Sequence, residues 1–192
     1  MELEEIKEFL LNTLEGKDID KARLIYDNLD IYNKYSNYIF NFYSSYPNND
    51  YAVYRSAYMY QHGMGIKQDY EKVIRLYERA VQLGNYKAMN NLAILYQNGQ
   101  GIEQDYKKAV ELYERSIKLG NSCAMNNLAR MYKSGKGIEQ NDEKAVELFL
   151  MAYNLGNEKS LDCICDILKR NNTLTIKFIN KLTMIKIKLL TN

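Results

Sequence analysis

The amino-acid sequence predicts an all-α protein built as a stacked array of two-helix repeats. Three units of equal length follow one another over residues 49–84, 85–120 and 121–156, and the second and third agree at about 20 of their 36 positions. This period lies in the range of two-helix repeats. Glycines and tyrosines recur in one register through the units: Gly63, Gly99 and Gly135; Gly65, Gly101 and Gly137; Tyr60, Tyr96 and Tyr132.

The first segment of each unit has the apolar spacing of a helix. In the middle unit the apolar positions follow one another at steps of three and four residues: Ala88, Met89, Leu92, Ala93 and Tyr96. That spacing places them on one face of a helix. Alanines hold matching places in every unit, namely Ala52, Ala88 and Ala124, and Ala57, Ala93 and Ala129. We expect neighbouring helices to approach closely at these small residues.

A glycine loop joins each first helix to a second helix. Glycine directly after a helix adopts the left-handed conformation that ends it, and a second glycine allows a tight turn. Asp69, Asp105 and Asn141 follow the loops, where their side chains can cap the next helix. A phosphate-binding loop would need a preceding strand and a following Lys-Ser/Thr, and neither is present. The glycine pairs are therefore interpreted as structural turns.

The second helix of each unit is also amphipathic. Its inward positions are Ala109, Leu112, Tyr113 and Ser116 in the middle unit, and Ala145, Leu148, Phe149 and Ala152 in the third. On its opposite side Glu78, Glu111, Glu114 and Glu147 lie among Lys and Arg, the pattern of a solvated helix face. Each second helix ends at a Leu-Gly-Asn sequence.

Residues 1–48 are expected to form an N-terminal helical cap or a degenerate repeat. Apolar spacing predicts one helix through Leu3, Ile6, Leu10 and Leu14 and another through Ala22, Ile25 and Leu29. A third follows from Ile31 to Tyr46 and stops at Pro47. Terminal units of a stacked array must cover an apolar face, so atypical ends are expected.

Residues 157–192 are expected to form a degenerate repeat and a C-terminal capping helix. Its first-helix stripe is Ser160, Leu161, Ile164, Cys165 and Leu168, and Lys169-Arg-Asn-Asn172 stands where the glycine loop would be. The tail over 173–190 places Phe178, Leu182, Ile185 and Leu189 on one helical face. Two short alternating strands, or docking of this basic tail on a membrane surface, stay open as alternatives.

Composition excludes several classes of protein. A net charge of +2 gives no reason to expect nucleic-acid binding. The start lacks the pattern of a secretory signal, and no apolar run is long enough to span a bilayer, so we expect a soluble, intracellular, cytoplasmic protein. Cys123, Cys163 and Cys165 lack the spacing of zinc or redox sites and are interpreted as small buried thiols.

The repeat pattern resembles the Sel-like repeat, a relative of the tetratricopeptide repeat. The middle unit carries its motif as Ala88, Leu92, Ala93, Tyr96, Gly99, Gly101, Asp105, Lys108, Ala109, Tyr113 and Gly120. The resemblance covers residues 49–156, with a degenerate unit from Asn157. Val73 in place of Ala, and Asp142 in place of Tyr70 and Tyr106, are departures from it.

The resemblance implies an α-solenoid whose first helices line a concave, ligand-binding face. By that register the partner-binding residues are Tyr51, Tyr54, Tyr58, Lys87, Asn90, Gln97, Asn126, Arg130 and Lys133. The two asparagines suit the backbone of an extended peptide, and the cations favour an acidic segment or a free carboxylate. The alternative is that these are only solvated polar residues.

The function expected from these features is a non-enzymatic adaptor that binds a protein or peptide, without metal or cofactor. His62, the only histidine, matches Asn98 and Ser134 in the other units and is interpreted as a polar helix-end residue rather than a catalytic one. The alternative function is a regulatory subunit or inhibitor acting on a partner enzyme through the same surface. Hydrolase activity, claimed for some members of the family, is a more distant possibility.

Overall fold

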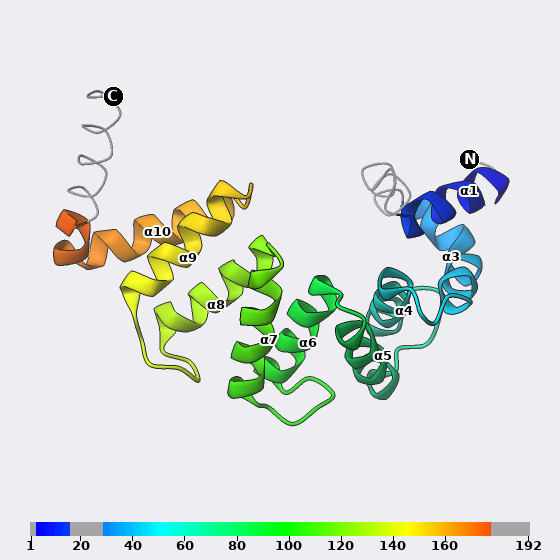
Figure 1. Cartoon of the computed structure of the whole chain (residues 1–192), viewed down its shortest axis with the longest axis horizontal. Helices are drawn as coiled ribbons and strands as arrows, with labels where there is room; N and C mark the ends of the chain where they lie inside the picture. The colour runs from blue at the N-terminus through cyan, green and yellow to red at the C-terminus, as the bar shows by residue number, and fades with distance from the viewer. Residues whose placement is uncertain (1–2, 16–28, 178–192) are drawn as a thin grey trace. The chain divides into compact units, whose positions relative to one another are not determined.

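The computed structural model describes residues 3–15 and 29–177, with side chains omitted for 29–33. In the part it describes, every regular element is an α-helix, and the chain is an all-α repeat solenoid, as predicted (Figure 1). The chain divides into two compact units, unit 1 over residues 1–104 and unit 2 over residues 105–192. Each unit is described by itself.

Unit 1 is built from helices that pack in chain order. These helices are α1 (Leu3–Leu14), α3 (Leu29–Ser44), α4 (Asp50–His62), α5 (Tyr70–Gln82) and α6 (Tyr86–Asn98). Helix α4 packs against both α3 and α5, and α5 packs against α6. The N-terminal core buries Ile6, Leu10, Ile39, Tyr43, Ala52 and Met59. The first and third N-terminal helices are therefore confirmed, whereas the one expected at Ala22 and Ile25 lies outside the described residues.

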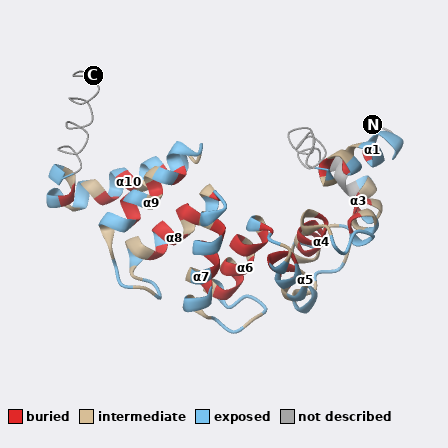
Figure 2. Ribbon diagram, viewed as in Figure 1, coloured by how far each residue is buried: buried red, intermediate tan, exposed pale blue. Residues whose placement is uncertain are grey.

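Unit 2 has the same order of packing. Its helices are α7 (Tyr106–Lys118), α8 (Ser122–Ser134), α9 (Asp142–Asn154) and α10 (Lys159–Arg170). Helix α8 packs against α7 and α9, and α9 packs against α10. Figure 2 shows buried residues on the helices and exposed residues over the loops. The core here is made of Ala129, Ala145, Val146, Phe149, Ile164, Ile167 and Leu174.

The helices of the three repeats begin directly after residues whose side chains cap free backbone N–H groups of the first turn. The side-chain oxygens of Asp69, Asp105 and Asn141 accept hydrogen bonds of 3.1, 3.0 and 2.9 Å from the backbone N–H three residues later, as predicted. The asparagines of the first two Leu-Gly-Asn sequences, Asn85 and Asn121, have an additional role that sequence reasoning missed. Each caps the following first helix, for example through a 2.8 Å bond from the Ala88 N–H to Asn85.

The two glycines of each loop are required for different structural reasons. Gly99 ends α6 in the left-handed conformation, at φ +66°. Gly101, at φ +72°, lies against the start of α5 in the preceding repeat, and an added Cβ would be 2.5 Å from the Tyr70 Cβ. Gly137 meets Tyr106 in the same way within unit 2. The second glycine therefore allows the loop to pack on the neighbouring repeat, beyond allowing a turn.

The last full repeat replaces this glycine contact by an ion pair. Asp142 holds the position of Tyr70 and Tyr106, and its carboxylate accepts a 2.6 Å charged bond from Arg170 and a 3.3 Å bond from Asn171. Both partners belong to the segment that stands where the glycine loop is missing. The departure at Asp142 is thus matched by a change in its neighbour.

Two expectations about side-chain burial are wrong. Cys123 and Cys165 are exposed and Cys163 is half-buried, because neighbouring residues of α8 and α10 already fill the core. In α10 the buried stripe runs through Ser160, Ile164 and Ile167, while Leu161 is 45% exposed. The helix is therefore rotated from the expected register.

The C-terminal tail is described only at its beginning. Residues 172–177 are helical, and Leu174 packs into the unit 2 core. Phe178, Leu182, Ile185 and Leu189 lie outside the described residues, so the choice between a capping helix, strands and a membrane-docking tail stays a prediction. No helix in the described ranges is both long and apolar enough to cross a membrane.

Candidate partner-binding face

An aromatic row runs along the first helix of repeat 1. The ring centroids of Tyr51 and Tyr54 are 6.0 Å apart, those of Tyr54 and Tyr58 6.3 Å, and those of Tyr58 and His62 4.2 Å. Residues three and four apart share one side of a helix, so these four rings form one continuous strip. We call this strip on α4 the aromatic face.

The rings differ in their exposure to solvent. Tyr54 is only 9% exposed and packs against Tyr77 at 6.1 Å between ring centroids, whereas Tyr51 and Tyr58 are half-buried. Burial, the largest cause, raises the pKa of the Tyr54 and Tyr77 hydroxyls above the usual range. Tyr54 is thus the back wall of the aromatic face, and Tyr51 and Tyr58 are its contact surface.

A hydrogen-bond chain fixes the back wall. The Tyr77 hydroxyl donates to Gln61 Oε1 at 2.6 Å and accepts from Asn91 Nδ2 at 3.1 Å. These bonds connect α4, α5 and α6 within unit 1. A rigid support of this kind lowers the entropy lost when a partner binds.

Positive charge lies over the rings of the aromatic face. The Arg55 guanidinium is 5.2 Å from the Tyr58 centroid and 6.0 Å from the Tyr43 centroid, and Arg55 is 8% exposed. The Lys87 ammonium, from α6, is 5.8 Å from the Tyr51 centroid. Such cation–π contacts hold the rings and add positive potential to the surface.

His62 is the last residue of the aromatic face. Burial first, and the charge of Arg55 second, lower the pKa of its imidazole below the usual value. Its ring packs on that of Tyr58. Among the described residues, no group of three or more His, Cys, Asp or Glu could hold a metal ion.

The remaining predicted residues of unit 1 come from α6. Asn90 is 7% exposed, and its Nδ2 donates to Asn91 Oδ1 at 3.1 Å. Gln97 is half-buried, and its backbone carbonyl accepts from Gln104 Nε2 at 2.8 Å. Lys87 and Gln97 therefore reach the surface, while Asn90 lies behind it.

In unit 2 the predicted residues connect α8 to α10. Asn126 is 6% exposed, donates to Ser160 Oγ at 2.8 Å and accepts from Arg130 Nε at 2.8 Å. Lys133 forms a 3.3 Å ion pair with Asp166. Both ends of the Asn126 carboxamide are thus used inside the unit, and Arg130 is the exposed member of the set. Ser160, where earlier repeats have alanine, is the sequence signal for this bond.

The three repeats differ at the positions of the aromatic face. Tyr51 corresponds to Lys87 and Cys123, and Tyr58 to Ile94 and Arg130. The buried framework position next to Tyr51 is alanine in all three repeats. Packing of the repeat therefore does not require an aromatic residue at these sites. Arg55, which lies over the Tyr58 ring, was not identified from the sequence.

Several solved structures resemble this chain. A Sel1 repeat protein from Oxalobacter formigenes superposes with a TM-score of 0.67 at 24% identity, over 75% of this chain and 60% of that one. A protective antigen of uropathogenic Escherichia coli with an SLR fold gives a TM-score of 0.63 at 25% identity, over 67% and 28% of the two chains. Cysteine-rich protein B of Helicobacter pylori gives 0.53 at 21% identity, over 64% and 90%. This chain thus spans less than two thirds of the first two proteins.

The family follows from the repeats themselves. No curated protein matches the sequence significantly. The model of the Sel1 repeat matches residues 50–85, 87–121 and 124–157, which together are more than half of the chain. Sel1 repeats generally form a non-catalytic fold that mediates protein–protein interaction. The chain belongs to the Sel1 repeat family, as its repeat motif implied.

Proposed function

We propose that this chain is a non-enzymatic adaptor that binds a peptide or protein segment on its first helices, with the aromatic face of α4 as the principal contact. The observation that carries the proposal is the pair of half-buried rings, Tyr51 and Tyr58, held between a buried back wall and two cations. Tyrosine contributes large, rigid contact area and a polar hydroxyl, and it is enriched at the centres of interfaces.

The chemistry of the partner follows from the charge of this surface. Arg55 and Lys87 place positive charge over the rings, so an acidic segment with an apolar or aromatic side chain is the complement. In unit 2, Arg130 is the exposed cation of the corresponding helix. Asn90 and Asn126 support these surfaces from behind instead of meeting the partner.

A cytoplasmic location is part of the proposal. All three cysteines are free, and two of them are exposed on helices. Free, exposed thiols persist in a reducing compartment.

A displayed library of random peptides, selected on the intact chain, supplies a probe for this function. The Kd of a selected peptide is then measured by fluorescence anisotropy for the native chain and for the double variant Tyr51→Ala/Tyr58→Ala. The loss of two interface tyrosines is expected to weaken binding at least about tenfold, because hot-spot side chains each contribute about 1 kcal/mol or more.

The matched control is Tyr153→Ala. Tyr153 lies on α9 and is 41% exposed, so its removal takes away comparable aromatic surface elsewhere. It should leave the Kd within about twofold. Equal affinity of the native chain and the double variant for every selected peptide would refute the assignment of the aromatic face.

A further inference from the structure

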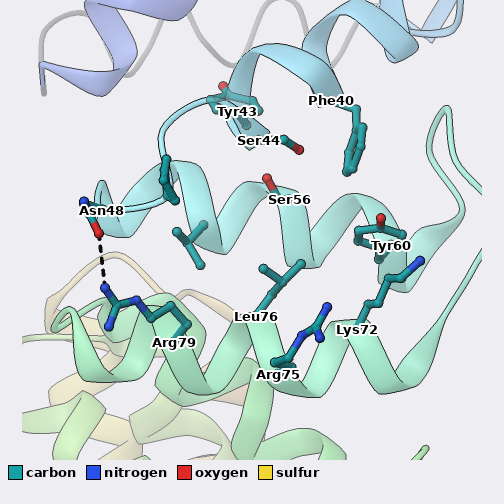
Figure 3. Close-up of a pocket in the computed structure, with 12 residues that line it drawn as sticks. Phe40, Tyr43, Ser44, Asn48, Ser56, Tyr60, Lys72, Arg75, Leu76 and Arg79 are labelled. Atoms are coloured by element: carbon teal, nitrogen blue, oxygen red, sulfur yellow. Dashed lines mark hydrogen bonds between the residues drawn. The ribbon is translucent and has the colours of Figure 1, made fainter.

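A hollow lies on the other side of α4 from the aromatic face. It is a cavity of about 370 Å³ between α3, α4 and α5, and Figure 3 shows its lining. Phe40, Tyr60 and Leu76 supply its apolar walls, and the Phe40 and Tyr60 rings meet edge to face at 5.2 Å. Tyr60 is two residues beyond Tyr58, which places it about 200° around the helix. We call this cavity the basic groove.

Three cations of α5 line the basic groove in one row. Lys72, Arg75 and Arg79 are spaced by three and four residues, so they lie along one side of the helix over roughly 10 Å. None of the described residues that line the cavity is acidic. The groove therefore joins an apolar pocket to a positively charged edge.

The three cations differ in their present contacts. The Lys72 Nζ is 3.3 Å from Asp69 Oδ2 and lies over the Tyr60 ring, and an Arg79 Nη donates to Asn48 Oδ1 at 3.2 Å (Figure 3). Arg75 makes no hydrogen bond or ion pair with the residues that the structure describes. A charged guanidinium at the middle of the row is thus available to an incoming carboxylate.

Unit 2 contains a comparison within the same chain. A cavity of about 350 Å³ lies between α7, α8 and α9, where Tyr132 takes the place of Tyr60 and Lys144 that of Lys72. Glu147 stands in place of Arg75, and Met151 in place of Arg79. The repeat framework therefore forms the hollow in both units, whereas the row of three cations is particular to unit 1.

We propose that the basic groove is a second docking site, for an acidic segment of a partner protein. An apolar side chain of the segment enters the pocket between Phe40 and Leu76, and carboxylates of the same segment pair with Lys72, Arg75 and Arg79. Arginine binds carboxylate through two parallel hydrogen bonds, and opposite charge speeds the encounter. A pocket of this volume is at the small end of ligand sites, which suits one large side chain.

The length of the cation row selects a peptide over a single small anion. An extended chain advances about 3.3 Å per residue, so roughly 10 Å corresponds to three residues and accommodates acidic side chains at alternate positions. The apolar walls beside the row would be left unfilled by an inorganic anion. An acidic peptide with one large apolar residue satisfies both parts of the groove.

The probe is a fluorescein-labelled peptide of about nine residues with a central Phe flanked by Glu on both sides. Its Kd for the full chain is measured by anisotropy at about 50 and about 200 mM salt. Arg75→Glu introduces glutamate at this position, the same residue that unit 2 has at the corresponding position, Glu147. We expect at least a tenfold weaker Kd for this variant at low salt, and weaker binding by the native chain at higher salt.

The matched control is Lys144→Glu, which changes charge by the same amount at the edge of the unit 2 cavity. It should change the Kd less than about twofold, and circular dichroism of both variants verifies that they are folded. Probes with Gln in place of Glu, or Ala in place of Phe, should each lose affinity. Equal weakening by Arg75→Glu and Lys144→Glu would show non-specific attraction and overturn the proposal.

Two further outcomes distinguish a peptide bound in the basic groove from a ligand bound elsewhere or of another kind. The Tyr51→Ala/Tyr58→Ala variant tests whether the probe lies on the aromatic face instead, and in that background Arg75→Glu should weaken the probe by the same factor as in the native chain. If that variant loses the probe while Arg75→Glu retains it, the peptide lies on the aromatic face and the basic groove is not its site. Displacement of the probe by inorganic phosphate or a short DNA duplex at equal concentration would also overturn the choice of a peptide.

Discussion

Replacement of Gly101 by alanine tests how the repeats are held together. The added Cβ would lie 2.5 Å from the Tyr70 Cβ and 2.8 Å from its Cγ, well inside the contact distance of about 3.5–4.0 Å between carbon atoms. Tyr70 begins α5 directly after its Asp69 cap, and its hydroxyl accepts hydrogen bonds from Gln68 and Gln100. The ring therefore has little freedom to move away.

The magnitude follows from two separate costs. Left-handed backbone costs an alanine about 1–2 kcal/mol, partly offset by a stiffer unfolded chain. Overpacking against Tyr70 adds about 1–3 kcal/mol. We expect Gly101→Ala to lower the free energy of unfolding by about 2–4 kcal/mol, measured by urea denaturation followed by circular dichroism.

Gly84→Ala isolates the backbone cost. Gly84 also has positive φ, at +92°, but an added Cβ would meet nothing within 4 Å. This variant should lose only about 1 kcal/mol. In a Tyr70→Gly background the cost of Gly101→Ala should fall toward that of Gly84→Ala. Equal costs of the two alanine variants in the native background would refute the packing of the loop on the neighbouring repeat.

Three further predictions concern packing, the buried amide and pH. Ala93 is fully buried, so Ala93→Leu should overpack α6 and lower the free energy of unfolding by about 1–3 kcal/mol; an unchanged urea midpoint would contradict this. Asn126→Ala should cost about 1–3 kcal/mol, because it leaves the buried Ser160 hydroxyl without this partner, and a thermal melt equal to the native one would argue against it. Because the pKa of His62 is lower in the folded chain than in the unfolded chain, the unfolded chain binds this proton at a higher pH. Stability should therefore fall as pH drops below about 6.5, and His62→Asn should reduce that fall in urea titrations at about pH 8 and about pH 5.5.

The repeat framework could be predicted because its signals are local. Helical spacing, the caps at Asp69 and Asp105, and the left-handed glycines each depend on a few neighbouring residues. The register of α10 could not be predicted as well, because its repeat lacks the glycine loop. Its rotation follows instead from packing on α9, which buries Ile167 and leaves Leu161 exposed.

The candidate site could be predicted only in part, because its chemistry depends on contacts between distant residues. The repeat register placed Tyr51 and Tyr58 on one helix but gave no indication that Arg55 lies over the Tyr58 ring. Asn126 looked available because its partner, Ser160, is 34 residues away. A serine in place of the recurring alanine was the one sequence signal of that bond.

Photo-crosslinking tests the central claim about the aromatic face most directly. p-Benzoylphenylalanine is placed in one protein instead of Tyr58 and in another instead of Tyr153, and each is irradiated with the selected peptide. The proposed function predicts a covalent adduct of the peptide at position 58, identified by mass spectrometry, and little or none at position 153. A peptide that still binds but crosslinks equally at both positions, or only at position 153, would contradict the account.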